Sequence, residues 1–144
     1  LMIDMPPGTG DIQLTLAQRI PVTGAIIVTT PQNVALMDAT KGIELFNKVQ
    51  IPVMGVIENM STHICSNCGH EEQIFGTGGG DQLSEKYHIP LLGRLPLNVK
   101  IRENADAGTP SVIVGDDAAE NYMAIAQKIL DQLPAMHKAS NRIF

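Results

Sequence analysis

The sequence predicts an α/β fold in which a mostly parallel sheet is flanked by helices. Short apolar runs alternate along the chain with longer segments of helical period. The runs are continuously apolar, as in strands that are buried on both faces of a parallel sheet. Strand–helix–strand alternation is typical of parallel sheets with right-handed crossovers. With 144 residues, 44% of them hydrophobic, the chain is long enough for one domain with its own core.

Five apolar runs are expected to form strands. They are residues 1–4, 25–30, 53–57, 91–95 and, with a weaker pattern, 111–114. The first run opens the chain with no polar lead-in, although chain ends usually fray into water. We therefore expect residues 1–4 to be an interior strand of a larger domain and the chain to be a fragment.

Three segments are expected to be helices. In the first, apolar residues recur at three- and four-residue spacing from Val34 to Phe46. A second runs over residues 80–87, and a third over residues 118–133 with Asp117 and Glu120 spaced as a capping box. Pro134 is expected to end this last helix and to leave residues 135–144 as a loose tail.

The composition excludes several classes of protein. A net charge of −5 and a pI of about 5.2 give no basic face for nucleic acid. No apolar run approaches the roughly 18 residues that a membrane span needs. Two cysteines are too few for a disulfide scaffold. A soluble, cytoplasmic protein without nucleic-acid or membrane partners is the resulting expectation.

The segment after the first predicted strand has the composition of a nucleotide site. Asp4 ends an apolar run, where P-loop NTPases place the carboxylate that holds Mg²⁺. Gly8 and Gly10 allow a tight turn that brings N–H groups near a γ-phosphate. The alternative is an ordinary turn into a helix capped by Asp11.

The partner motif of a phosphate site is absent from the chain. A Walker A loop needs Gly-Lys followed by Ser or Thr, and none of the six lysines follows a glycine. The glycine-rich run at residues 76–80 has no lysine, so we expect it to form a turn into the next helix.

A polar insertion at residues 59–80 interrupts the strand–helix rhythm and contains a CxxC motif. Cys65 and Cys68 can direct both sulfurs at one metal ion, although a redox dithiol or inert cysteines are alternatives. Zinc and iron–sulfur clusters normally take four ligands. Either His63 and His70 complete a zinc site, or two chains contribute two cysteines each.

Three weaker signals lie at strand ends on the same expected edge of the sheet. Asn59 follows the second of the internal strands, residues 93–97 lie at the end of the third, and residues 29–32 lie at the end of the first. In open α/β sheets ligands bind beyond the carboxyl ends of the strands.

Several strings together carry a family resemblance. They are DMPPGTGD, TTPQ, GVIENMS, CSNCGHEEQIFGTGGG and GRLPLNVKIRENADAGTP. Over residues 1 to about 114 the chain resembles the C-terminal part of the Mrp/ApbC family of iron–sulfur cluster carrier ATPases. These are relatives of the MinD-like, deviant-Walker-A P-loop NTPases.

The resemblance implies a homodimer that binds ATP and Mg²⁺ and delivers a [4Fe–4S] cluster to apo iron–sulfur proteins. Cys65 and Cys68 of both chains would hold the cluster, which suits soft thiolate ligands. Asp4 would be the Walker B carboxylate, and Gly8 to Gly10 the segment that senses the γ-phosphate. Asn59 and the backbone of Pro96 and Leu97 would flank the adenine.

The resemblance also implies an incomplete domain. The lysine-containing phosphate loop of the family lies upstream of the Asp4 strand, so we expect an incomplete MinD/SIMIBI-like P-loop NTPase fold. Residues 1–133 would be the C-terminal part of the domain, with the metal-binding insertion at 59–80 and a flexible tail at 134–144. ATP binding and hydrolysis would belong to the full-length protein, and this chain alone would be inactive.

Two other functions compete with the carrier. One is a non-catalytic zinc-binding or interaction module that uses the CxxC. The other is a positioning ATPase of the MinD type, which predicts a basic amphipathic C-terminal helix. Residues 116–133 carry four acids against Lys128 alone, which disfavours the positioning ATPase.

Overall fold

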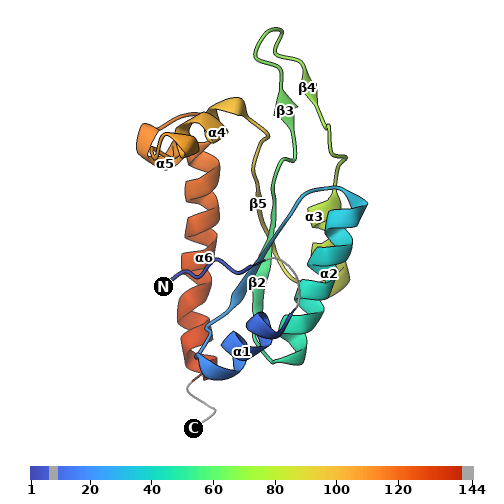
Figure 1. Ribbon diagram of the computed structural model, residues 1–144, viewed down its shortest axis with the longest axis vertical. Coiled ribbons are helices and arrows are strands. Elements are labelled where there is room, and N and C mark those ends of the chain that lie inside the picture. The colour runs from blue at the N-terminus through green and yellow to red at the C-terminus, as the bar shows by residue number, and fades with distance from the viewer. Residues whose placement is uncertain (7–9, 141–144) are drawn as a thin grey trace.

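A three-stranded parallel sheet forms the centre of the molecule (Figure 1). The computed structural model describes residues 1–6 and 10–140, of which 134–140 are described by their backbone alone. The strands are β1 (Ala25–Thr29), β2 (Val53–Glu58) and β5 (Leu91–Arg94), in the order β1-β2-β5. Both pairings are parallel, which confirms the predicted fold class and three of the five predicted strands.

Helices cover both faces of this sheet (Figure 1). On one face, α2 (Asn33–Lys48) and α3 (Gly79–Tyr87) pack with β1 and β2. That core comprises Ile27, Leu36, Ala39, Ile43, Val56 and Leu83. On the other face, α6 (Ala119–Ser140) packs on β5 through a second core of Leu92, Leu95 and Ile125. Ile26 joins the second core while its neighbour Ile27 joins the first, because successive side chains of a strand point to opposite faces.

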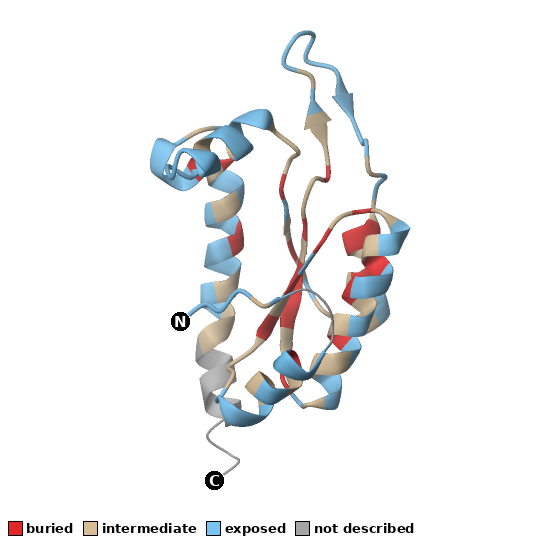
Figure 2. Cartoon of the chain, in the orientation of Figure 1, coloured by how far each residue is buried: buried red, intermediate tan, exposed pale blue. Residues whose placement is uncertain are grey.

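The remaining elements lie around the sheet. They are α1 (Asp11–Arg19), α4 (Val99–Asp106), α5 (Ser111–Val114), and the antiparallel pair β3 (His63–Ile64) and β4 (Glu71–Glu72). The β3–β4 hairpin projects beyond the sheet, and Figure 2 shows that its tip is exposed. Across the described residues, no helix has the length and apolar character needed to cross a bilayer.

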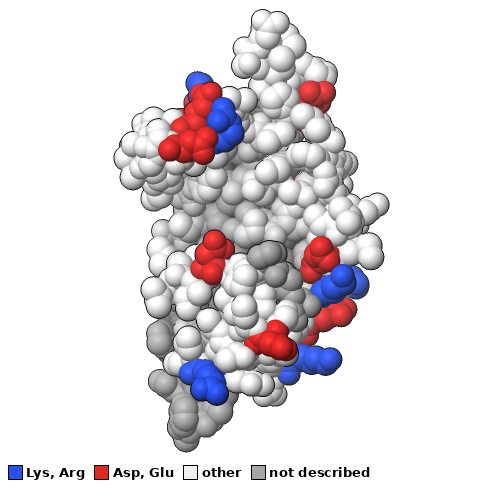
Figure 3. All heavy atoms as spheres, in the orientation of Figure 1, with Lys and Arg blue, Asp and Glu red and all other residues white. Residues whose placement is uncertain are grey.

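The charged residues of α4 pair with one another on the surface. Arg102 lies 3.0 Å from Asp106 and 3.3 Å from Glu103. In Figure 3 these pairs correspond to the adjoining blue and red atoms over α4. Exposed pairs of this kind add little stability. Their effect is to balance the charge of this element locally.

The expected strand at residues 1–4 does not form. Residues 1–6 are extended but pair with no strand in the described part of the chain, and Leu1, Met2 and Ile3 are exposed. A strand gains its hydrogen bonds only beside a partner strand. β1 is an edge strand of the described sheet, and no further strand pairs with it there. The apolar sequence of residues 1–4 is therefore not enough to make this segment a strand of the sheet.

The expected strand at residues 111–114 is also wrong, because these residues form the short helix α5. The N–H of Ile113 donates to the carbonyl of Pro110 at 2.8 Å, and the N–H of Gly115 donates to Ser111 at 2.8 Å. Gly115 has φ of 74°, which closes the helix in the left-handed region where glycine is favoured. These local bonds outweigh the β preference of Val and Ile in this segment.

The last helix is longer than predicted and begins with a different cap. The backbone of α6 is helical to Ser140, so Pro134 does not end it, and residues 141–144 of the expected tail lie outside the described residues. A proline inside a helix removes one backbone hydrogen bond and crowds the carbonyl one turn earlier, but here the helical backbone continues past it. At the start of α6, Asp116 rather than Asp117 accepts a backbone N–H, that of Ala118 at 3.0 Å.

The contact between α6 and β5 predicts that Gly93→Ala destabilises the protein. A Cβ at Gly93 would lie 2.5 Å from Cγ1 and 2.9 Å from Cδ1 of Ile125. We expect the free energy of unfolding in urea to fall by about 1–3 kcal/mol. Gly42→Ala is the matched control. Its Cβ meets Ile27 at an ordinary 3.6 Å within α2, and we expect a gain of about 0.5–1 kcal/mol. Equal stability of Gly93→Ala and the wild type would contradict this packing.

Candidate functional site

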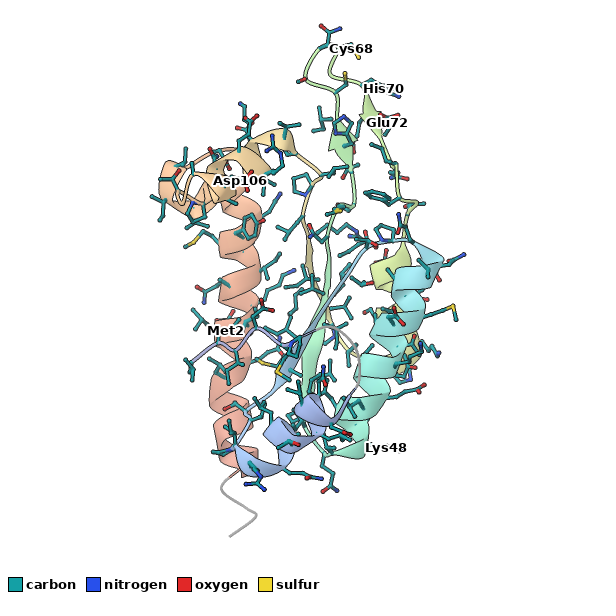
Figure 4. All side chains as sticks on the ribbon, in the orientation of Figure 1. Met2, Lys48, Cys68, His70, Glu72 and Asp106 are labelled. Carbon is teal, nitrogen blue, oxygen red and sulfur yellow. The ribbon has the colours of Figure 1, made fainter. Side chains whose placement is uncertain are left out.

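A tight turn at the tip of the β3–β4 hairpin holds the CxxC motif. His63 pairs with Glu72 and Ile64 with Glu71, so the turn starts at Cys65. The N–H of Cys65 donates to His70 at 2.9 Å, and the N–H of Gly69 donates back to Cys65 at 2.9 Å. Gly69 has φ of 71°, a conformation that favours glycine. Figure 4 shows Cys68 and His70 at the far end of the hairpin, with Glu72 on its returning strand.

Both cysteines are free thiols, and their surroundings favour a thiolate at Cys65. Cys65 is half-buried and Cys68 is exposed. Hydrogen bonds from the backbone N–H of Asn67 and of Cys68, and from the Cys68 side chain, lower the pKa of Cys65. Desolvation and the charge of Glu72 oppose this effect but do not cancel it. The thiolate is the form that binds metals.

The described residues of one chain supply two sulfurs and no complete metal site. Among the described residues, no group of three or more His, Cys, Asp or Glu side chains is gathered closely enough to hold a metal ion. The ring of His63 instead lies with Nδ1 3.2 Å from the carbonyl oxygen of Leu97. The zinc site that His63 and His70 would complete within one chain is therefore not formed.

The predicted adenine-flanking residues meet at the carboxyl edge of the sheet. The N–H of Asn59 donates to Thr29 at 2.7 Å, and its side-chain oxygen accepts from the N–H of Met60 at 2.9 Å. Pro96 and Leu97 follow β5 beside the chain that leaves β2. Leu97 uses both backbone groups internally, its N–H donating to Thr62 at 2.7 Å and its carbonyl lying against His63. This leaves the Pro96 carbonyl and the Asn59 amide nitrogen as the polar groups suited to a ligand.

The segment predicted to act on phosphate lies partly outside the description. Asp4 is exposed in the extended N-terminal segment, and Gly8 falls outside the described residues. Gly10 precedes α1 as its cap, so Asp11 is the first helical residue and not the cap. Met5 and Pro6, which follow Asp4, line a cavity of about 480 Å³ together with Thr29, Thr30 and Asn59. The structure thus brings residues 5 and 6 to a cavity that runs along β1 and α2, and Asp4 is not among the residues that line it.

A buried carboxylate that the sequence analysis missed joins the elements of this edge. Glu58, the last residue of β2, is 1% exposed. Its Oε2 accepts the N–H of Gly80 at 2.6 Å, and its Oε1 accepts Nε of Arg94 at 3.3 Å. Arg94 also pairs with Asp81, and this carboxylate, with a smaller contribution from Glu58, raises the pKa of Arg94. The signal in the sequence was an acid at the end of an apolar strand.

The glycine-rich run forms the expected turn into a helix. Gly78 precedes α3 in the left-handed region, and Gly79 and Gly80 are buried. A Cβ on Gly80 would lie 2.8 Å from Leu91 and 3.1 Å from Cβ of Glu58. The N-terminus of α3 favours an anion. The carboxylate of Glu58 already supplies one, which supports the structural reading of this run.

Comparison of the fold identifies the class of protein. The fold is that of MinD-like P-loop NTPases: the cell division ATPase MinD of Pyrococcus furiosus superposes with a TM-score of 0.59 at 22% identity. That superposition covers 76% of this chain and 43% of MinD. A nucleotide-binding protein of Archaeoglobus fulgidus in complex with ADP gives a TM-score of 0.68 at 32% identity, over 82% of this chain and 48% of that one.

Sequence relatives place the chain within this class. Residues 1–131 match the ParA family described as NUBPL iron-transfer P-loop NTPases, and the chain belongs to this family. The "Iron-sulfur cluster carrier protein" of Escherichia coli K12 is 60% identical over 135 residues, which are 94% of this chain and 36% of that protein. The mouse "Iron-sulfur cluster transfer protein NUBPL" is 47% identical, over 92% of this chain and 42% of its own length. The chain therefore spans less than half the length of these curated relatives.

The Glu58 contacts predict that Glu58→Ala destabilises the protein. The buried N–H of Gly80 would lose its acceptor, and Arg94 would lose one of two carboxylates. Because Arg94 is half exposed and keeps Asp81, we expect a loss of about 2–3 kcal/mol in the free energy of unfolding in urea. Glu85→Ala, on the exposed side of α3, is the control and should change stability by less than about 0.5 kcal/mol. A similar small change for Glu58→Ala would contradict the role of this carboxylate.

The turn also predicts that Cys65 reacts as a thiolate at lower pH than an ordinary cysteine. The midpoint of its alkylation rate against pH, followed by mass spectrometry of the metal-free protein, should lie below the usual value near 8.5. Cys68→Ala should raise this midpoint by removing a side-chain donor, and Glu72→Gln should lower it by removing a negative charge. A midpoint that neither substitution moves would contradict these causes.

Proposed function

We propose that the protein is an iron–sulfur cluster carrier that binds a cluster through Cys65 and Cys68 and passes it to apo-proteins. The observation that supports this function is the pair of free cysteines at the exposed hairpin tip, with N–H groups directed at Cys65. Such donors stabilise a thiolate without occupying its metal-binding capacity. An exposed tip also lets a recipient protein approach the cargo.

The number of sulfurs favours a shared cargo. Iron–sulfur clusters of the [4Fe–4S] type take four cysteine thiolates, and one chain offers two. We therefore propose a homodimer in which the two CxxC motifs face each other and hold one [4Fe–4S] cluster. No other group of ligands in the described part of the chain competes for it. Free thiols of this kind fit a reducing compartment, which for this protein we propose to be the cytoplasm.

A nucleotide is proposed to bind at the carboxyl edge of the sheet. The amide nitrogen of Asn59 and the backbone carbonyl of Pro96 would contact the adenine, and Leu97, whose own N–H and carbonyl are bonded within the chain, would lie beside it. Asp4 would hold Mg²⁺, with Gly8 and Gly10 beside the γ-phosphate. Mg²⁺ would supply charge neutralisation on the phosphates.

Binding of the phosphates also requires a Walker A lysine, which these residues do not include. None of the six lysines of the chain follows a glycine, as a Walker A lysine would. Because the chain spans 36% of its bacterial relative, we propose that residues 1–133 are the C-terminal part of an NTPase domain, with residues 59–80 as its metal-binding insertion. ATP hydrolysis would then belong to the complete domain.

Anaerobic reconstitution with ferric iron, a thiol reductant that converts part of it to ferrous iron, and sulfide tests the carrier function. We expect a visible iron–sulfur absorption, with one cluster for every two chains. Cys65→Ala and Cys68→Ala should each abolish it, because each removes half of the sulfurs that a chain supplies. His70→Phe, which changes an exposed side chain of the same hairpin, is the control and should keep the cluster.

Transfer completes this test. The loaded protein should pass iron and sulfide to an apo-ferredoxin, followed by the recovery of its visible spectrum. Stoichiometric zinc that is lost in Cys65→Ala, with no iron-dependent absorption, would instead identify a zinc-binding module.

A further inference from the structure

The two proposed sites lie at opposite ends of one leg of the hairpin. Five residues separate Asn59, at the end of β2, from Cys65. Over this stretch the chain stays bonded to the loop that follows β5. The N–H and the hydroxyl of Ser61 donate to the carbonyl of Leu95 at 3.0 and 3.1 Å, and Leu97 donates to Thr62 at 2.7 Å. This leg is thus an extension of the parallel β2–β5 pairing, with a bridge between His63 and Leu97 at its end.

The side chain of His63 makes the last contact before the cysteines. Its ring is half-buried, and Nδ1 lies 3.2 Å from the carbonyl oxygen of Leu97. Two residues further on, the N–H of Cys65 donates to the carbonyl oxygen of His70. In the described part of the chain, the hydrogen bonds between the hairpin and the loop at residues 95–97 all come from this leg.

The returning leg is anchored elsewhere. After β4 the chain reaches α3, where the N–H of Gly80 is bound by Glu58 at the base of the hairpin. A movement of residues 95–97 therefore reaches the cysteines through Ser61, Thr62 and His63. Of these contacts, the His63 ring is the side-chain bond nearest to Cys65.

We propose that His63 is a positioning residue that links the loop at residues 95–97 to the cysteine turn, so that a nucleotide bound against this loop changes the rate at which the cluster leaves. The inference rests on the proposed function, because it takes the adenine to lie at Pro96 and the cluster at Cys65 and Cys68. A ligand that orders the loop restrains the Leu97 carbonyl, and through it the hairpin strand that ends at Cys65. His63 itself touches neither the nucleotide nor the cluster.

Cluster release from the full-length carrier tests this link. The loaded protein is mixed anaerobically with bipyridine, and ferrous iron capture is followed with and without Mg-ATP. For the wild type we expect the two rates to differ by about fivefold or more. His63→Phe removes the bond to Leu97 but keeps an aromatic ring, and it should reduce the difference to less than about twofold. Its cluster content, visible spectrum and nucleotide affinity should remain those of the wild type.

Three further variants separate this role from a general effect on folding. His63→Asn carries a carboxamide nitrogen near the position of Nδ1 and should keep the response to nucleotide. His70→Phe replaces the other histidine of the hairpin and should also keep it, because its carbonyl still accepts from Cys65. Ser61→Ala removes only the hydroxyl bond to Leu95 and should give an intermediate response in a folded protein.

The outcomes distinguish this inference from the proposed function. A wild type that assembles no cluster would overturn the carrier function and the link with it. A loaded wild type whose rate of cluster release is the same with and without Mg-ATP would overturn the link alone. A His63→Phe protein with an unchanged response would also overturn the link, as would a His63→Asn protein that loses the response although it keeps a nitrogen for the bond to Leu97.

Discussion

The buried carboxylate of Glu58 is the constraint on which the functional edge depends. It lies where β2 ends and where the metal-binding insertion begins, and it binds the N–H of Gly80, where the insertion returns to the fold. The same carboxylate accepts from Arg94, at the end of β5. Burying a charge is costly unless it is paired and hydrogen-bonded, and here a guanidinium and a helix N-terminus satisfy it. Both ends of the insertion are thereby held at one point of the sheet.

The sheet and its covering helices follow from sequence patterns because burial dominates them. The segments that became β1, β2 and β5 are apolar up to their last residue, and α2 repeats its apolar residues with helical spacing. The two misplaced strands show the limit of such patterns. Residues 1–4 and 111–114 are also mostly apolar, but strand formation requires pairing with a neighbouring strand, which local sequence does not encode.

The candidate site, too, could be predicted from the sequence only in part. The CxxC spacing identified Cys65 and Cys68, since two thiols three positions apart on a turn can face one ligand. The contacts of Glu58 with Arg94 and of His63 with Leu97 join residues 36 and 34 positions apart. Such pairs depend on which strands become neighbours, and no periodicity in the chain predicts them. His63 therefore looked like a possible metal ligand, whereas its ring is used to hold the hairpin.

The length of the hairpin has a mechanical consequence. From Asn59 to Cys65 the chain turns once, at Met60 with φ of 54°, and six steps of strand rise set an upper length of about 20 Å for this arm. A tilt of about 5° at the base of such an arm would move the sulfurs by about 2 Å, ten times the tolerance of about 0.2 Å within which metal–ligand distances must fall. The hairpin in Figure 1 thus projects from a base that is held by Glu58, and a small rotation at this base becomes a large displacement at the tip. A rotation of a few degrees at the Glu58 base therefore determines whether the cysteines of two hairpins can bind one cluster, although this base is far from the sulfurs.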